Sequence, residues 1–365
     1  MNTKRPELKR IAGLKRIMEA AGIDALLITK RENVRYLTGF TGSAGSVLVA
    51  LGKPCLITDF RYAIQARGEA AGVSILIQKK GHPAGVREAA ERANVKTLWF
   101  DETSFTIESL NALRKQGLKL KGHRDLVGEL RQQKDPLELV SIRKAIRRAE
   151  ESFRELSASI RPGARESALA LMLEFMMREK GARKAAFDTI VASGRNGAMP
   201  HASVSDRRIK QGDLVTFDFG AEADGYFSDM TRTVCVGRPS ARQREIHGLV
   251  LQAQQVAIAA VRPGVACTAV DGAARNLIGE AGHAKQFGHG TGHGIGLMVH
   301  EGPSISPLSR DLVQPRMVFT IEPGIYIPGW GGVRIEDMVL VTDTGVKVLT
   351  TLPRGLEGPE KTAAA

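Results

Sequence analysis

The stretch VTFDFGAEADGYFSDMTRTV, residues 215–234, contains two apolar runs joined by an Asp-Gly pair. The pair at 224–225 is typical of a tight hairpin turn, so we expect the two runs to pair as antiparallel strands. This hairpin would bring Asp218, in the first run, and Asp229, which opens the second, onto one face. Two carboxylates so close together repel each other. A divalent cation between them would turn that repulsion into coordination.

Three further residues extend this acidic pair into a candidate metal site. Glu322 in TIEPG and Glu336 in RIED each lie in an apolar, strand-like run, where acids are rare unless they are paired or bind a metal. His293 adds one imidazole. Four carboxylates balance the charge of two divalent cations better than that of one, so we expect two ions. Oxygen ligands with a single imidazole suit Mn²⁺, Co²⁺, Fe²⁺ or Zn²⁺.

The segment GHGTGHGIGLMVHEGP, residues 288–303, carries three of the eight histidines of the chain: His289, His293 and His300. Its alternating glycines do not form the GxGxxG fingerprint of dinucleotide-binding proteins. The HxxxH spacing is that of a zincin helix, but Gly290 stands where that motif has Glu, and glycines disfavour a helix. A glycine-rich loop with incidental histidines is the remaining alternative. The density of histidines favours a functional site.

Two other residues are ambiguous from the sequence. His201 follows Pro200 in a loop-like stretch, where a histidine is more often incidental. Arg334 lies two residues before Glu336 in a strand-like run, so its side chain would point to the same face as that acid. An arginine on the surface at a strand end is the alternative.

Hydrophobic patterning divides the chain into two predicted domains. In the first half, short apolar runs alternate with helical patterns, which is typical of an α/β domain. The second half combines long helices with paired strands and predicts an α+β layer structure. We expect the boundary near residue 130, just before a long amphipathic helix that starts at Asp135. The predicted domains are residues 1–130 and 131–365.

The predicted elements of the second domain can be placed by their periodicity and by flanking Pro and Gly. Besides the long helix, helices are expected at residues 166–179, 240–260 and 268–281. Strands are expected at residues 214–221, 229–237, 316–327 and 333–342.

Composition narrows the class of protein. The 365 residues are 43% hydrophobic and 25% charged, close to the averages of soluble globular proteins. No run approaches the ~20 apolar residues of a membrane span, and the basic N-terminus lacks the apolar core of a signal peptide. Cys55, Cys235 and Cys267 form no CxxC pair. We therefore expect a cytoplasmic protein with reduced thiols.

The net charge of +13 raises the possibility of nucleic-acid binding. The basic residues are spread along the chain, however, without interleaved aromatics or a recognisable binding motif. We interpret the charge as a solvated surface, because net charge governs solubility and nonspecific attraction rather than the choice of partner.

Seven motifs, taken in order, resemble those of the pita-bread metallopeptidases, the family of methionine aminopeptidase, aminopeptidase P and prolidase. They are NVRYLTGFTGSAG, ITDFRYAIQA, SGRNGAMPHA, FDFGAEADGYFSDMTRT, GHGTGHGIGLMVHEGP, TIEPGIY and RIEDMVLVT. The first two argue against methionine aminopeptidase, which lacks a domain ahead of its catalytic part. The resemblance implies an α+β pita-bread catalytic domain preceded by a smaller, creatinase-like α/β domain.

The resemblance also implies which residues bind metal. The implied ligands are Asp218, Asp229, His293, Glu322 and Glu336. Asp229 and Glu336 would bridge two divalent ions, with Mn²⁺ or Co²⁺ expected before Zn²⁺ or Fe²⁺. Met298 departs from the pattern, because family members often carry an acid there, but that position is not a metal ligand.

The remaining roles concern the substrate. The resemblance implies that Glu322 orients a metal-bridging hydroxide, which attacks the carbonyl before a proline. His201 and His300 would act with it, by holding the peptide and stabilising the developing oxyanion. His289 and Arg334 would line the substrate pocket. We expect a homodimer that acts on short proline-containing peptides, without nucleic-acid or membrane partners.

The leading prediction is an Xaa-Pro aminopeptidase, which removes an N-terminal residue before a penultimate proline. The alternative within enzymes is a strict Xaa-Pro dipeptidase, or prolidase. A metal-free, creatinase-like hydrolase is disfavoured by the complete set of five ligands. A binding protein on the same fold is the alternative outside enzymes.

Overall fold

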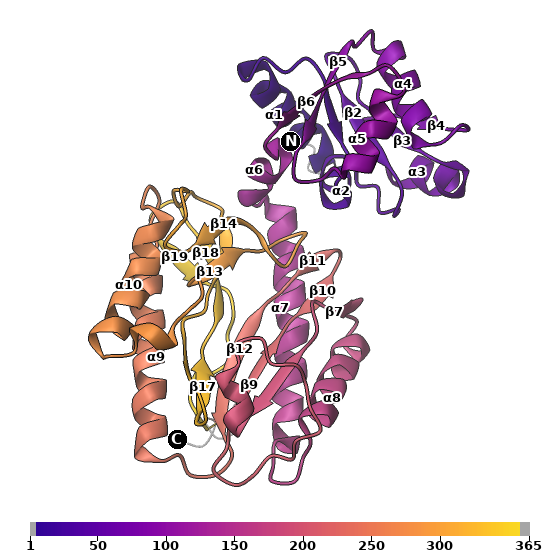
Figure 1. The fold of residues 1–365 in the computed structure, drawn as a ribbon. Helices are drawn as coiled ribbons and strands as arrows, with labels where there is room; N and C mark the ends of the chain where they lie inside the picture. Colours follow the sequence, from indigo (N-terminus) through magenta and orange to yellow (C-terminus); the bar gives the residue numbers. More distant parts are fainter. Residues whose placement is uncertain (1–4, 358–365) are drawn as a thin grey trace. The chain divides into compact units, whose positions relative to one another are not determined.

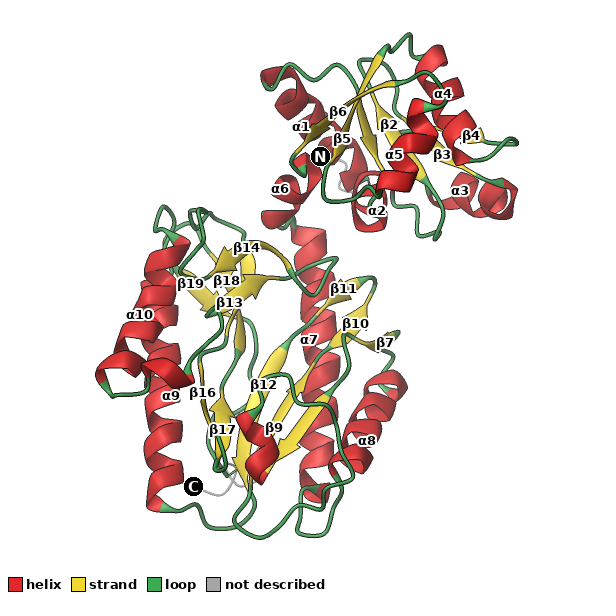
Figure 2. Cartoon of the chain, in the orientation of Figure 1, coloured by secondary structure: helices red, strands yellow, loops and turns green. Residues whose placement is uncertain are grey.

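The computed structural model describes residues 5–357, and the chain divides into two compact units, residues 1–131 and 132–365. Figure 1 shows both units with their elements labelled, and Figure 2 separates helix, strand and loop. No helix in the described part of the chain is long and apolar enough to cross a membrane.

The first unit is a six-stranded mixed sheet with helices around it. The strands lie in the order β4-β3-β2-β1-β5-β6. Its helices are α1 (Pro6–Ala20), α2 (Arg31–Thr38), α3 (Ala63–Glu69), α4 (His82–Arg92), α5 (Ile107–Arg114), α6 (Leu126–Gln132) and the short 3₁₀ helix η1 (Phe60–Tyr62). Its strands are β1 (Leu26–Ile28), β2 (Ser46–Val49), β3 (Cys55–Thr58), β4 (Ser74–Ile77), β5 (Thr97–Asp101) and β6 (Lys119–His123).

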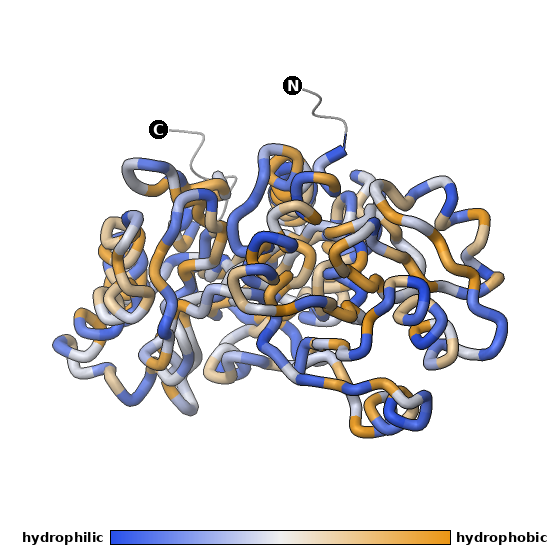
Figure 3. Tube along the Cα trace, turned by 90° about the horizontal axis from the view of Figure 1, so that it is seen from above, coloured by the Kyte–Doolittle hydropathy of each residue, from blue (hydrophilic) through white to orange (hydrophobic). Residues whose placement is uncertain are grey.

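Apolar residues of both element types fill the core of the first unit. Leu48 and Ile57 on neighbouring strands pack with Val86 and Ala89 of α4, and all four are buried. The helix α1 starts at Pro6, a residue that suits a first turn because its missing N–H has no partner there anyway. Figure 3 shows hydrophobic and hydrophilic segments alternating along the trace, as expected of elements with one buried face.

The second unit holds long helices and several small sheets. Its helices are α7 (Pro136–Leu156), α8 (Glu166–Glu179), α9 (Ala241–Ala260) and α10 (Cys267–Glu280), with the 3₁₀ helices η2 (Ser157–Ser159), η3 (Gly194–Ala198) and η4 (Ala284–Gln286). Its strands are β7 (Lys184–Ala185), β8 (Ile190–Ser193), β9 (Leu214–Phe219), β10 (Ala221–Ala223), β11 (Tyr226–Phe227), β12 (Met230–Cys235), β13 (Gly292–Gly294), β14 (Glu301–Ile305), β15 (Val318–Ile321), β16 (Gly324–Ile327), β17 (Gly331–Arg334), β18 (Asp337–Val341) and β19 (Val346–Val348).

The sheets of the second unit lie between two pairs of helices. The sheets have the orders β12-β9-β8, β14-β13-β15-β18-β19, β11-β10-β7 and β16-β17. Figures 1 and 2 show α7 and α8 on one side of these strands and α9 and α10 on the other. The predicted mixture of helices and strands in an α+β layer structure is confirmed, and the helices start and end within one residue of the predicted positions at α8, α9 and α10.

The long helix α7 shows how the sequence specifies this packing. Asp135 caps its start, and the side chain of Glu138 accepts a hydrogen bond from the backbone N–H of Asp135, which completes a capping box. On its buried face, the ring of Phe153 stacks on Phe219 at 4.8 Å and meets Phe217 edge-on at 5.3 Å. These contacts fix α7 against β9, the strand that also carries Asp218.

The quoted stretch forms a hairpin with an interruption in it. Asp224 and Gly225 both have positive φ angles, 51° and 80°, as the tight turn requires. Beyond the turn, pairing stops at Gly220 and resumes between β9 and β12, where Asp218 lies opposite Thr231. Side chains alternate along a strand, so Asp229, two positions before Thr231, shares its face with Asp218.

The other two acids lie at breaks between strands rather than inside them. The predicted strand at 316–327 is two strands, β15 and β16, with Glu322 between them. The predicted strand at 333–342 is likewise split into the end of β17 and the whole of β18, with Glu336 at the break. Both predicted strands ran through these breaks, although Pro323 and Gly324 follow Glu322 and Asp337 follows Glu336. At each break the acid lies outside the strands, so its side chain does not follow their alternation.

Candidate active site

A cavity of about 950 Å³ lies in the second unit, and all nine residues singled out from the sequence line it. They are Asp218, Asp229, His293, Glu322, Glu336, His201, His300, His289 and Arg334. They come from five separate stretches between residues 201 and 336, so only the fold brings them together.

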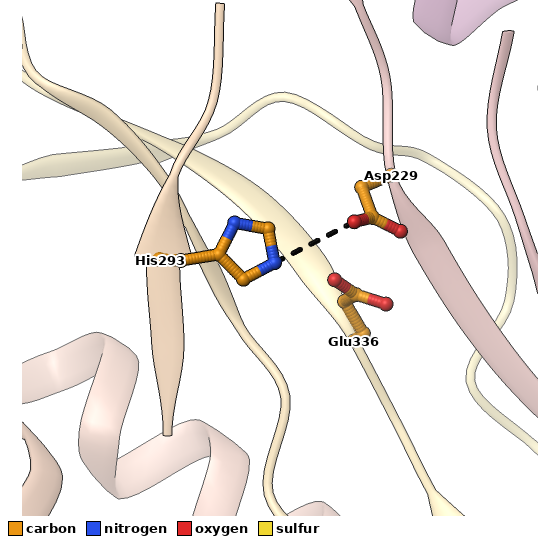
Figure 4. Close-up of side chains that lie close together, drawn as sticks. All are labelled: Asp229, His293 and Glu336. Carbon is orange, nitrogen blue, oxygen red and sulfur yellow. Dashed lines mark ion pairs between the residues drawn. The ribbon is translucent and has the colours of Figure 1, made fainter. Parts of the chain in front are cut away.

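The acids and one histidine form the tightest group. Ligand atoms of Asp229, His293 and Glu336 all lie within 4.8 Å of one another, and Figure 4 shows the three side chains pointing toward a common point. The Nε2 atom of His293 lies 3.6 Å from Asp229 Oδ2 and 3.3 Å from Glu322 Oε1. This arrangement matches the donor set of a site for a hard or borderline divalent cation.

The hydrogen bond of His293 defines which of its nitrogens faces the acids. Its Nδ1 lies 3.1 Å from the carbonyl oxygen of Gly294, which can only accept, so Nδ1 carries the proton. Burial lowers the pKa of His293, which keeps the ring neutral near pH 7. Nε2 therefore presents a lone pair to the acidic group, which is the arrangement usual in metal-binding histidines.

The carboxylates of this group also have the properties expected of cation ligands. Asp218 Oδ1 and Glu336 Oε1 are buried oxygens with no hydrogen-bond partner among residues 5–357, and such oxygens are rare unless something binds them. Burial, followed by the charge of Glu336, raises the pKa of Asp229 well above its usual value. Burial, followed by the charge of Glu322, does the same to the pKa of Glu336. Divalent cations would relieve this repulsion.

Two threonines that sequence reasoning missed hold these acids in place. Thr231 donates its hydroxyl to Glu336 Oε2 at 2.7 Å and accepts from Arg334 Nε at 3.0 Å. Thr320 donates to Glu322 Oε1 at 3.0 Å and accepts the backbone N–H of His293 at 3.1 Å. A threonine in a strand carries no signal of such a role, because it is also a common strand former.

Arg334 connects the acidic group to the rest of the cavity. Its Nη2 donates to Asp218 Oδ2 at 2.7 Å, and its Nη1 donates to the hydroxyl of Tyr326 at 2.8 Å. Burial acts to lower the pKa of Arg334, but Tyr326 and Asp218 outweigh it and raise that pKa. The arginine is therefore a permanent buried cation rather than the surface residue that the sequence left possible.

Tyr326 extends this connection to His289. The His289 Nδ1–H donates to the carbonyl of Gly290 at 2.8 Å, so its Nε2 accepts from the Tyr326 hydroxyl at 3.0 Å. Burial raises the pKa of Tyr326 to about 12 and lowers the pKa of His289. Tyr326 lies in the TIEPGIY motif, but nothing in its spacing singled it out.

His201 and His300 complete the cavity. The rings of His300 and His293 are 4.1 Å apart between centroids. Desolvation within the cavity lowers the pKa of His300, although its side chain is exposed, so that its ring is neutral near pH 7. His201 is exposed and lines the same cavity from the loop after η3. A neutral imidazole can donate an N–H to a substrate oxygen.

Comparison with models of protein families shows which family the chain belongs to. The model of metallopeptidase family M24 matches residues 140–343, more than half of the chain. The chain belongs to metallopeptidase family M24. In addition, the creatinase/prolidase N-terminal domain matches residues 10–133 of this M24 metallopeptidase. Family membership implies divalent metal ions and an enzyme, and it accounts for the cluster of acids around His293.

Individual relatives of this M24 metallopeptidase cover almost its whole length. The Xaa-Pro dipeptidase of Pyrococcus horikoshii is 38% identical over 93% of this chain and 96% of its own. The solved structure of the Xaa-Pro dipeptidase from Bacillus anthracis superposes with a TM-score of 0.93 at 39% identity, over 96% of this chain and 99% of that one. The X-Pro aminopeptidase from Thermotoga maritima gives a TM-score of 0.87 at 38% identity, over 95% and 99%. These similarities confirm the pita-bread fold.

Proposed function

We propose that this M24 metallopeptidase is an Xaa-Pro dipeptidase that depends on two divalent metal ions. The observation that carries the proposal is the convergence of four carboxylates and His293 on one cavity, where two buried carboxylate oxygens have no hydrogen-bond partner among the described residues. The relatives named as Xaa-Pro dipeptidases support this choice over the aminopeptidase that the sequence first suggested.

The five residues of the acidic group would hold the metal ions. Asp229, Glu336 and His293, whose ligand atoms lie within 4.8 Å of one another, would form the centre of this group. Asp218 and Glu322 flank them. When bound, the ions would polarise the scissile carbonyl and lower the pKa of a bound water. The homodimer and the cytoplasmic location expected from the sequence stay predictions.

The protein's own side chains would transfer a proton and stabilise the negative charge that develops on the substrate. Glu322 lies 3.3 Å from His293 and is oriented by Thr320, so it is placed to take a proton from the attacking water and return it to the proline nitrogen. Like any amide nitrogen, the proline nitrogen must gain a proton before it can leave as an amine. His201 and His300 would donate N–H groups to the developing oxyanion.

Substrate length separates the two enzyme readings. We would measure kcat/KM for Leu-Pro and for Leu-Pro-Gly with the protein loaded with Mn²⁺ or Co²⁺. A dipeptidase cleaves Leu-Pro and leaves the tripeptide nearly untouched. Efficient release of leucine from Leu-Pro-Gly would instead identify an Xaa-Pro aminopeptidase.

Two variants test whether the measured peptidase activity arises at this cavity. Glu322→Gln should lower kcat by at least about 100-fold, since it removes the proton acceptor, whereas Glu179→Gln at the exposed end of α8 should have no effect. Cleavage of neither peptide by metal-loaded protein would reject both enzyme readings and favour the binding-protein alternative.

A further inference from the structure

One wall of the cavity has no part in the metal site. Four residues of α8 line it, Ser167, Ala170, Leu171 and Glu174. Their spacing of three, four and seven positions places them on one face of the helix. Because α8 packs beside β8, the segment before that strand lies next to this face and adds Phe187 and Asp188. We call Leu171, Glu174, Phe187 and Asp188 the outer arm.

The outer arm carries two carboxylates that form no ion pair with a basic side chain among the described residues. Neither Glu174, which is half-buried, nor Asp188, which is exposed, has a side-chain hydrogen bond or ion pair within residues 5–357. The nearby bases Arg183 and Lys184 are turned to another acid, Glu222, at 2.7 Å and 4.0 Å.

A buried hydroxyl next to these acids also lacks a partner. Thr189 lines the cavity between Asp188 and β8 and is only 3% exposed. Its Oγ1 makes no hydrogen bond to any described residue. Buried hydroxyls are normally hydrogen-bonded, so this one indicates a polar ligand group or a water that the arm receives.

The apolar part of the outer arm suits a long side chain with a charged end. Leu171 is 70% exposed despite facing the cavity, and Phe187 is half-buried beside Asp188. Lysine and arginine bury their aliphatic stems against apolar surface while the charged end stays at a polar site. An aromatic ring also attracts a cation that lies over its face.

The chemistry of an Xaa-Pro dipeptide decides which part can occupy the arm. Its proline end carries a carboxylate, which Glu174 and Asp188 would repel, and the proline ring has no charge. Only the N-terminal residue can present a cation. Its α-ammonium, which every Xaa-Pro dipeptide has, is two bonds from the scissile carbonyl carbon and stays near the acids around His293, whereas a lysine or arginine side chain reaches further. The cavity is also near the upper limit of about 300–1,000 Å³ for pockets that hold drug-sized ligands, which leaves room beside a small dipeptide.

We propose that the outer arm selects substrates with lysine or arginine at the N-terminal position, with Glu174 and Asp188 as the specificity-determining residues. This proposal rests on the proposed Xaa-Pro dipeptidase activity and names its preferred substrates. It assigns the positively charged substrate end to α8 and the segment before β8, away from the metal-binding residues.

The test compares Lys-Pro with Met-Pro, a neutral dipeptide of similar length, on the metal-loaded protein. We expect kcat/KM for Lys-Pro to exceed that for Met-Pro by about three- to tenfold at low salt, and this ratio should fall toward one in high salt because the arm is open to solvent. Glu-Pro should be the poorest of the three substrates. A ratio is used because it cancels differences in the active fraction of a preparation.

Substitutions in the outer arm test whether it sets the ratio of kcat/KM for Lys-Pro to that for Met-Pro. Glu174→Gln and Asp188→Asn should each lower the Lys-Pro to Met-Pro ratio, and Glu174→Lys should shift the preference toward Glu-Pro. Glu179→Gln removes the same charge from α8 outside the cavity, and it should leave the ratio unchanged.

Two results would overturn the proposal: equal kcat/KM for Lys-Pro and Met-Pro in the wild type, or a preference that survives in both neutral variants. If no Xaa-Pro dipeptide is cleaved at all, the proposed function fails instead. The arm is then tested by the Kd values of Lys-Pro and Met-Pro, measured by calorimetry on the same proteins, and equal values would reject it.

Discussion

Removing one charge from the acidic group should stabilise the metal-free protein while it weakens metal binding. In Asp229→Asn the side chain keeps its size and loses its charge. Burial and Glu336 raise the pKa of Asp229 in the folded state, so folding at alkaline pH forces two like charges together or forces one to keep a proton. Neither cost arises in Asp229→Asn, because residue 229 then carries no charge.

The distance in the structure sets the size of the effect. Ligand oxygens of Asp229 and Glu336 lie within 4.8 Å, and two unit charges at that separation repel by about 3 kcal/mol at an effective dielectric constant of about 20. We therefore expect the free energy of unfolding of metal-free Asp229→Asn to exceed that of the wild type by about 2–3 kcal/mol at pH 8. For a unit of this size, the melting temperature would rise by about 5–12 °C.

The sign of the pH dependence follows from proton binding. A carboxyl whose pKa is raised by folding binds more protons in the folded state, so its stabilising effect is present at low pH and is lost as pH rises through the folded pKa. The advantage of the variant should therefore vanish near pH 4, below which Asp229 is protonated in both states. Buried histidines such as His293 have lowered pKa values and act in the opposite direction. They are present in both proteins and cancel in the difference.

Thermal unfolding after exhaustive chelation, at pH 4 and pH 8, would measure this difference. Asp343→Asn, an exposed change in the same unit, is the control and should have no effect. Excess Mn²⁺ should reverse the order, because it stabilises the wild type by mass action and binds the variant more weakly. If metal-free Asp229→Asn is no more stable than the wild type at pH 8, repulsion between Asp229 and Glu336 does not destabilise the metal-free protein.

Three other changes test separate parts of the structure. Gly292→Ala should abolish metal binding by calorimetry, since its Cβ would lie 1.9 Å from the Thr320 carbonyl oxygen and displace β13, whereas Gly288→Ala meets no atom within 4 Å and should bind normally. Lys134→Met breaks a buried 2.8 Å ion pair with Glu301 and should lower the free energy of unfolding by about 3–5 kcal/mol in urea; a loss below about 1 kcal/mol would contradict this. Chelation of the wild type should lower its melting temperature more at pH 8 than at pH 5, and equal losses would argue against repulsion among the acids.

Local patterns in the sequence were enough to predict the long helices and the hairpin strands, but not short strands such as β8 and β13. The apolar stripe of α7 with its Asp135 cap and the Asp224-Gly225 turn are short-range signals, so both could be placed without tertiary information. The predicted strands ran through the breaks at Glu322 and Glu336 because apolar residues dominate the stretches around them. The Pro323-Gly324 pair after Glu322 is a local signal of a strand end, whereas Asp337 after Glu336 gives no comparable signal.

The candidate site could be predicted as far as its residues have unusual chemistry for their surroundings. An acid in an apolar run, such as Glu336, is conspicuous in a sequence. Thr231 and Tyr326 are not, although they hold Glu336, Arg334 and His289 in place. Thr231 lies 105 positions from Glu336, and Tyr326 lies 37 positions from His289 and 8 from Arg334. The hydrophobic pattern of a strand does not report such side-chain partners.

Anomalous diffraction from crystals grown with Mn²⁺ would locate the metal ions directly. We expect two peaks in the second unit, both within coordination distance of Asp229 and Glu336, and one of them within coordination distance of His293. A Mn²⁺-saturated crystal with no peak between these side chains, or with its peaks elsewhere on the protein, would contradict this expectation.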